Sequence, residues 1–212
     1  RVAEEDVSNA AYPVATMRKI TVGAAPVGAI RIGYVGELGW ELHVPTEYAA
    51  HVYELLREAG ETHGIADAGY RAIDSLRLEK SYLYWSSDIT PDYSPLEAGL
   101  GFRVNFSKGD FIGRDALLKQ REAGVKQKLV TFLLDDYLPL YGSEAVMVDG
   151  KVVGVTTGGN FGYTVGKAIG YGYLPVELIA RGEVEIEAFG QVSTAKIVTK
   201  AAYDPDNLRL KA

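Results

Sequence analysis

The chain has 212 residues, with 22 Lys and Arg against 28 Asp and Glu, so its net charge is −6. This acidic balance disfavours a nucleic-acid partner, which would require a basic surface, and the absence of cysteine excludes disulfides, thiolate metal sites and cysteine nucleophiles. Neither an apolar run of the ~20 residues that cross a membrane nor a signal peptide is visible. We therefore expect a soluble intracellular protein, and its 47% hydrophobic residues are enough for a core.

The first elements are short. Residues 4–19 predict a short helix and a loop, with Asp6 or Ser8 as a cap and Pro13 as the break. Residues 20–32 alternate around a turn at residues 23–26, which is typical of two joined strands.

Three helices are predicted next. The first covers residues 47–59 and ends at Gly60 as its C′ residue. The second covers residues 68–81, where we expect Arg77 to form a structural ion pair or to cap carbonyls. The third covers residues 113–122 and closes near Gly124.

After residue 126 the pattern predicts strands only. They cover residues 129–134, 145–148, 152–155, 168–174, 184–189 and 195–198. Asp149 and Gly150 indicate a type I′ hairpin, and the short strands together favour a small antiparallel barrel or sandwich. The glycine-rich residues 158–167 do not fit a phosphate-binding loop, so we expect a turn-rich barrel segment there. These elements predict an α+β chain with domains at residues 1–124 and 125–212.

The stretch from Tyr34 to Leu42, YVGELGWEL, is unusual for a turn because it combines two carboxylates with a tyrosine and a tryptophan. Its flanks predict two strands, and Gly36 and Gly39 would supply positive φ or close approach. One interpretation is a binding loop. The other is a plain hairpin whose aromatic residues are core and whose Glu41 is a buried structural carboxylate.

Four stretches in order resemble motifs of the glycine-cleavage T-protein (aminomethyltransferase) superfamily. They are YVGELGWEL (34–42), DSLRLEK (74–80), SPLEAGL (94–100) and GVTTGG (154–159). The Trp-Glu-Leu version is most similar to the folate-binding part of dimethylglycine and sarcosine dehydrogenases. The resemblance implies the C-terminal part of a T-protein-like folate-binding α/β domain, followed by a small antiparallel β-barrel.

The resemblance also implies site residues for tetrahydrofolate. Glu41 would bind the pterin with Tyr34 beside it, one of Leu42 and His43 would face the ligand, and Phe102 would stack on a ring. The aromatic loop at residues 82–95 would either line this pocket or pack on the core. Ile73 stands where the family often has a folate-binding arginine. The three histidines are spread along the chain, so no metal site is expected.

The function implied is tetrahydrofolate-dependent one-carbon (methylene) transfer, as the C-terminal part of a dimethylglycine/sarcosine dehydrogenase-like flavoenzyme. The alternatives are a stand-alone aminomethyltransferase of the glycine cleavage system, a folate-dependent demethylase, or a non-catalytic folate-binding or regulatory module. The family's catalytic aspartate and the FAD domain are expected upstream, so we expect this chain to be a fragment that is inactive alone. Its partners would be folate, a small methylated amine or aminomethyl donor, and the missing N-terminal half. Its location would be the cytoplasm, or the mitochondrial matrix in a eukaryote.

Overall fold

The structure, a computed structural model, describes residues 2–211, which fall into two compact units. The N-terminal unit comprises Arg1–Ile73 with Asp206–Ala212, and the barrel unit comprises Asp74–Pro205. The division falls inside helix α2 (Tyr70–Glu79). The mixture of helices and strands confirms the α+β class, whereas the predicted domains 1–124 and 125–212 remain a prediction.

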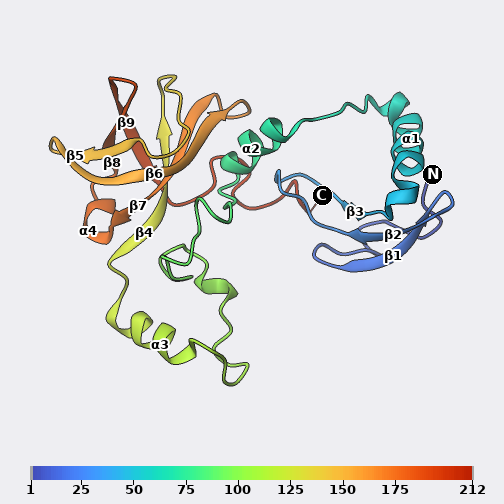
Figure 1. Cartoon of the computed structure of the whole chain (residues 1–212), viewed down its shortest axis with the longest axis horizontal. Coiled ribbons are helices and arrows are strands. Elements are labelled where there is room, and N and C mark those ends of the chain that lie inside the picture. Colours follow the sequence, from blue (N-terminus) through green and yellow to red (C-terminus); the bar gives the residue numbers. More distant parts are fainter. Residues whose placement is uncertain (1, 212) are drawn as a thin grey trace. The chain divides into compact units, whose positions relative to one another are not determined.

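The N-terminal unit is built on an antiparallel sheet in the order β1-β2-β3 (Figure 1). The strands are β1 (Met17–Val22), β2 (Ala25–Ile30) and β3 (Glu41–His43). The predicted pair of strands around residues 23–26 is therefore confirmed. Alternate residues of β1 and β2 face one core, because successive side chains of a strand point to opposite faces. That core contains the buried residues Tyr12, Ile20, Val22, Ala25, Val27, Ala29 and Val52.

Helix α1 (Ala49–Gly60) packs Val52 into this core, and short 3-10 turns flank it at Thr46–Tyr48 and Glu61–His63. The prediction that Gly60 ends the helix as a left-handed C′ residue is wrong. Gly60 has a φ of −84°, and Gly64 takes the left-handed conformation instead. Glycine is needed at position 60 for space, since a Cβ there would lie 2.7 Å from the Cβ of Ile65.

The predicted helix in residues 4–19 is also wrong. Those residues form turns and then enter β1 at Met17. Asp6 accepts a hydrogen bond from the backbone of Ser8, and the Ser8 hydroxyl accepts one from Ala11. These side chains close local turns, which is the alternative that Asp and Ser offer to a helix cap.

The barrel unit contains six antiparallel strands that close in the order β4-β7-β6-β5-β8-β9. The predicted small antiparallel barrel is therefore confirmed, whereas the strand order was not predicted. The strands are β4 (Gln127–Leu134), β5 (Ala145–Val148), β6 (Lys151–Gly162), β7 (Lys167–Pro175), β8 (Glu183–Ala188) and β9 (Gln191–Val198). A short helix, α4 (Val176–Ile179), follows β7. Asp149 and Gly150 both have positive φ, which confirms the predicted type I′ hairpin. The glycine-rich segment is strand as far as Gly162 and turns only after it.

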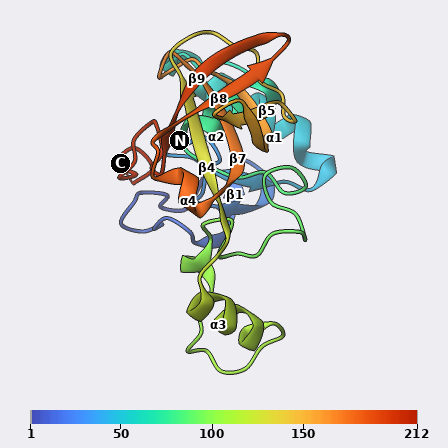
Figure 2. The ribbon, with the colours of Figure 1, turned by 90° about the vertical axis from the view of Figure 1, so that its left-hand side faces the viewer.

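Helix α2 contributes its second half to the barrel unit, where Leu78 packs with Ile169 and Tyr171 of β7. The Tyr171 hydroxyl donates to the carbonyl of Leu78 at 2.7 Å. The expectation for Arg77 is confirmed, because its buried guanidinium pairs with Asp74 and Asp88 and also donates to the carbonyl of Tyr82. The 3-10 turn Gly101–Arg103 and helix α3 (Arg114–Ala123) follow, and Figure 2 shows the chain passing from α3 into β4.

Candidate functional site

Arg31 holds the connection between β2 and β3 in place. Its guanidinium is buried, donates to the carbonyl of Gly39 at 3.1 Å and to the Asn9 side chain at 2.9 Å, and lies 5.2 Å from the ring of Trp40. Trp40 in turn meets Tyr12 edge to face at 4.6 Å. The connection therefore has the aromatic core of the plain-hairpin interpretation. Sequence reasoning missed Arg31, although an arginine between two isoleucines of a strand is a signal of a paired buried cation.

Gly36 and Gly39 have the two different roles that were expected of glycine here. Gly36 has a φ of +79°, and a Cβ on Gly39 would lie 3.3 Å from the carbonyl oxygen of Ile32. The chain therefore folds back on itself and enters β3 with Glu41 opposite Ile30.

Strand alternation separates the predicted residues of β3. Leu42 packs against the core of the unit, whereas Glu41 and His43 point to the opposite face. The Glu41 carboxylate lies 3.9 Å from Nε2 of His43, and their side chains are 50% and 61% exposed. Glu41 is thus not a buried structural carboxylate, and His43 is its neighbour on the open face.

The strand register adds further residues to this open face. We call the whole set, including Glu41 and His43, the outer face. One row across the strands contains Met17, Ile30 and Glu41, and the next contains Lys19, Gly28 and His43. Gly28 adds no side chain, and a Cβ there would lie 3.4 Å from the terminal methyl of Met17. The outer face therefore combines a low apolar floor with a carboxylate and an imidazole at one edge and an ammonium at the other. Its Met17, Lys19, Gly28 and Ile30 were missed because cross-strand register is not visible in the sequence.

Tyr34 and Phe102 complete the predicted set. Tyr34 is half-buried in the β2–β3 connection. Phe102 belongs to the barrel unit, where its ring is 76% exposed and the guanidinium of Arg103 lies 4.9 Å from it. Glu41 and His43 are thus brought together, Leu42 points to the core, and Phe102 is available to stack in its own unit.

The aromatic loop at residues 82–95 uses several of its rings within the barrel unit. Tyr93 stacks on Tyr173 with centroids 3.5 Å apart, and Tyr84 lies under the guanidinium of Arg77. Trp85 is 65% exposed. Packing on the core thus accounts for Tyr84 and Tyr93, and Trp85 is left at the surface.

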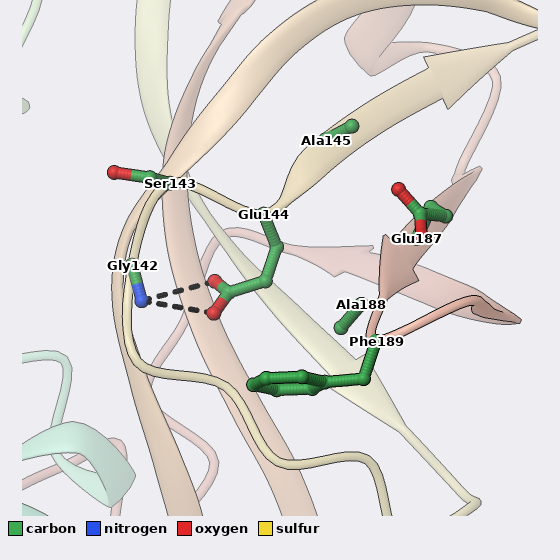
Figure 3. A pocket seen from close by; sticks show the side chains of 7 residues that line it. All are labelled: Gly142, Ser143, Glu144, Ala145, Glu187, Ala188 and Phe189. Carbon is green, nitrogen blue, oxygen red and sulfur yellow. Dashed lines mark hydrogen bonds between the residues drawn. The ribbon is translucent and has the colours of Figure 1, made fainter.

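A hollow of about 300 Å³ opens on the barrel between the segment 142–145 and the residues 187–189 (Figure 3). The Glu144 carboxylate points into it but accepts hydrogen bonds from the backbone of Tyr141 and Gly142 and from the hydroxyl of Thr156. The acceptors of Glu144 are therefore used to close its own turn. This hollow is a weaker candidate than the outer face.

Metal-ligand clusters and membrane-spanning helices are both absent from residues 2–211. No three His, Asp or Glu side chains of this part of the chain come together as metal ligands would. None of its helices is long and apolar enough to cross a membrane.

Comparison with known proteins identifies two family domains. The GCVT N-terminal domain matches residues 1–108, and the glycine cleavage T-protein C-terminal barrel domain matches residues 127–204. A mouse (Mus musculus) mitochondrial sarcosine dehydrogenase is 43% identical over 99% of this chain and 24% of its own length. Mouse mitochondrial dimethylglycine dehydrogenase is 41% identical over 100% of this chain and 25% of its own length. The chain therefore spans about a quarter of these relatives.

The solved aminomethyltransferase T of the Bartonella henselae glycine cleavage system has the same architecture. It matches 84% of this chain and 50% of its own chain, with a TM-score of 0.77 and 29% identity. The resemblance seen in the four sequence motifs is thereby confirmed, and so is a T-protein-like domain followed by its barrel. The chain belongs to the glycine cleavage T-protein family and is an aminomethyltransferase-type domain related to sarcosine and dimethylglycine dehydrogenases.

Proposed function

We propose that the outer face of the N-terminal unit binds tetrahydrofolate, with Glu41 as the anchor of the pterin. The pterin presents N–H and NH2 donors, and a carboxylate accepts two such donors in charge-assisted hydrogen bonds. The observation that carries the proposal is the half-exposed Glu41 carboxylate, with the imidazole of His43 at 3.9 Å. A ligand with paired donors could therefore hydrogen-bond to this carboxylate without first breaking a network of hydrogen bonds within the protein.

The remaining parts of folate match the rest of the outer face. The flat aminobenzoyl ring suits the low floor around Gly28 and Met17. The anionic glutamate tail suits Lys19, which is exposed on β1, two strands away from Glu41. Two strand spacings of about 4.8 Å, combined with two residues of about 3.4 Å along the strands, make this separation roughly 12 Å. Tyr34 is the predicted neighbour of the pterin, and Phe102 is a predicted stacking residue that needs a separate test.

The activity we propose is one-carbon transfer to this folate, as the C-terminal part of a dimethylglycine or sarcosine dehydrogenase-like flavoenzyme. FAD would supply the oxidation of the amine methyl group in the part of such enzymes that this chain does not match. The role of this chain is to bind and orient the folate that receives the one-carbon unit. The alternatives are an aminomethyltransferase of the glycine cleavage system and a folate-dependent demethylase, in which the same outer face would bind the same folate.

The test is tetrahydrofolate binding to the natural full-length protein by isothermal titration calorimetry. Glu41→Ala should weaken binding by about 1.5–3 kcal/mol, the range for hydrogen bonds to a charged group, or roughly 10- to 150-fold in Kd. Glu47→Ala is the matched control, because it removes another exposed carboxylate from the same unit. Equal affinity of the Glu41→Ala and Glu47→Ala proteins would contradict the anchoring role.

A further inference from the structure

Strand β3, which carries Glu41 and His43, has little of its own to fix its register. It is three residues long, whereas β1 and β2 have six residues each and pair along their whole length. The connection that leads into it, residues 31–40, is long, and loop length fixes the register of a hairpin only where the turn is tight. A slip of one residue would turn Glu41 and His43 towards the core. Another contact must therefore set the face on which they lie.

Arg31 is in the place to make that contact. It directly follows Ile30, whose pair with Glu41 is the last of the β2–β3 ladder. The backbone N–H of Arg31 donates to the carbonyl of Thr16 at 3.0 Å, and its carbonyl accepts a hydrogen bond from the N–H of Ala15 at 2.9 Å. The side chain thus extends from a backbone that is held on both sides, and it is buried.

The guanidinium of Arg31 joins the connection to the N-terminal turns. Its Nη1 donates to the carbonyl of Gly39 at 3.1 Å, and its Nη2 donates to Oδ1 of Asn9 at 2.9 Å. The ring of Trp40 lies 5.2 Å from the same group. A planar fork with donors in fixed directions specifies where the Gly39 carbonyl lies. That carbonyl stands two residues before Glu41, so its position sets where β3 begins.

Packing alone does not explain a buried cation at position 31. Its side-chain partners among residues 2–211 are a carbonyl, an amide oxygen and an aromatic ring, all of them neutral. Replacing buried ionic groups by apolar residues of similar volume is often neutral or stabilising. The best-attested use of such a group is to select one register among several. The donors and the location of Arg31 match that use.

We propose that Arg31 is the positioning residue of the outer face. By fixing the Gly39 carbonyl it sets the register of β3, and with it the face on which Glu41 and His43 lie. Arg31 does not touch the folate and acts through Glu41. This proposal rests on the proposed function, because it concerns the affinity of the same site.

Hydrogen exchange of the natural protein, measured by mass spectrometry, tests the pairing of β3 without folate. Arg31→Lys keeps the charge but gives up the fork, so the β3 amides should exchange about tenfold or more faster. Val52→Ala is the matched control, because Val52 is buried in the same core but lies on α1. It should leave the β3 amides unchanged. Unchanged β3 exchange in Arg31→Lys would overturn the proposal, and so would equal acceleration by both variants.

Tetrahydrofolate titration of the natural protein tests whether Arg31 acts through Glu41. Arg31→Lys should weaken binding by about tenfold or more, up to the loss caused by Glu41→Ala. In a Glu41→Ala protein, Arg31→Lys should add less than about twofold, because the anchor that it positions is already gone. Val52→Ala should bind as tightly as the unaltered protein. Unchanged affinity of Arg31→Lys would overturn the positioning role, as would an equal loss with and without Glu41.

Asn9→Ala keeps the proposal testable if Arg31→Lys does not fold. It removes one of the two acceptors of the fork, so it should weaken binding by about fivefold, the equivalent of one net hydrogen bond. Unchanged binding by Asn9→Ala would then overturn the proposal. The two proposals can fail separately. Unchanged affinity of Glu41→Ala would contradict the pterin anchor, whereas the exchange of the β3 amides would still decide whether Arg31 sets the register.

Discussion

Asp88 is a fully buried acceptor of the barrel unit, and we predict that Asp88→Ala strongly destabilises that unit. Its carboxylate is fully buried and accepts hydrogen bonds from the guanidinium of Arg77 at 2.5 Å, the backbone of Tyr84 at 2.8 Å and the hydroxyl of Thr157 at 2.8 Å. One side chain thus joins helix α2, the loop that follows it and strand β6 of the barrel.

The magnitude follows from what the substitution leaves behind. Removing one member of a buried ion pair costs about 3–5 kcal/mol, because the other charge stays buried. Arg77 keeps Asp74 at 2.9 Å and the carbonyl of Tyr82 at 3.1 Å, which moderates the loss. The bond from the half-buried backbone N–H of Tyr84 is lost in addition, and a net hydrogen bond is worth about 1 kcal/mol. We therefore expect a loss of about 3–4 kcal/mol, since such contributions are not additive.

The assay uses the two tryptophans, one in each unit. Urea unfolding is followed by Trp85 fluorescence in a Trp40→Phe background, and by Trp40 fluorescence in a Trp85→Phe background. For an m-value of about 2 kcal/mol/M, Asp88→Ala should lower the urea midpoint of the Trp85 signal by about 1.5–2 M. The midpoint of the Trp40 signal should change much less.

Two controls sharpen this prediction. Asp88→Asn keeps the shape and an acceptor oxygen, so it should cost clearly less than Asp88→Ala. Adding Arg77→Leu to Asp88→Ala should cost less than the sum of the single changes, because no buried charge is left unpaired. A loss below about 1 kcal/mol for Asp88→Ala would refute the reasoning, since that is the size of an ordinary neutral hydrogen bond.

Two further predictions concern the same unit. Gly159→Ala should destabilise it by about 3 kcal/mol or more, because the new Cβ would lie 2.4 Å from the Cβ of Leu140. A Cβ on Gly158 would have its nearest atom 3.4 Å away, so Gly158→Ala is the control. Equal urea midpoints for the two variants would contradict this prediction. Burial, together with the nearby acidic groups, raises the pKa of Tyr173 above its ordinary value near 10. The folded state then retains a proton that the unfolded state loses, so stability falls as pH rises above 10. Tyr173→Phe has no hydroxyl to titrate, so it lacks this loss. The amount by which its free energy of unfolding falls below that of the unaltered protein should therefore shrink by about 1.4 kcal/mol between pH 9 and 11 in urea titrations.

Local signals predicted most of the fold. The barrel strands alternate or run apolar, and the Asp149-Gly150 pair specifies its hairpin through two positive φ values. Helices α1, α2 and α3 lie within a few residues of their predicted limits. The helix expected in residues 4–19 was wrong because Asp6 and Ser8 close local turns there. The other error occurred where a tertiary contact decided the outcome. Gly60 looks like a helix stop, but its lack of a side chain makes space for Ile65.

The candidate site was predicted only in part, because strand pairing, which local sequence does not specify, brings some of its residues together. Period-two alternation places Glu41 and His43 on one face and Leu42 on the other, and the sequence carries that information. It does not carry the register that sets Lys19 and Gly28 beside His43, because that pairing joins residues far apart in the chain. Strand order and register depend on the whole sheet.

The most direct measurement of the central claim follows the fate of the methyl carbon. The natural protein is supplied with methyl-13C-labelled sarcosine or dimethylglycine and tetrahydrofolate, and the products are resolved by NMR. We predict that the unaltered protein and Glu47→Ala place the label in methylenetetrahydrofolate, whereas Glu41→Ala oxidises the amine equally fast and releases the label as formaldehyde. The same label distribution in all three proteins would contradict the role of Glu41, and oxidation of neither amine would contradict the proposed dehydrogenase-like activity.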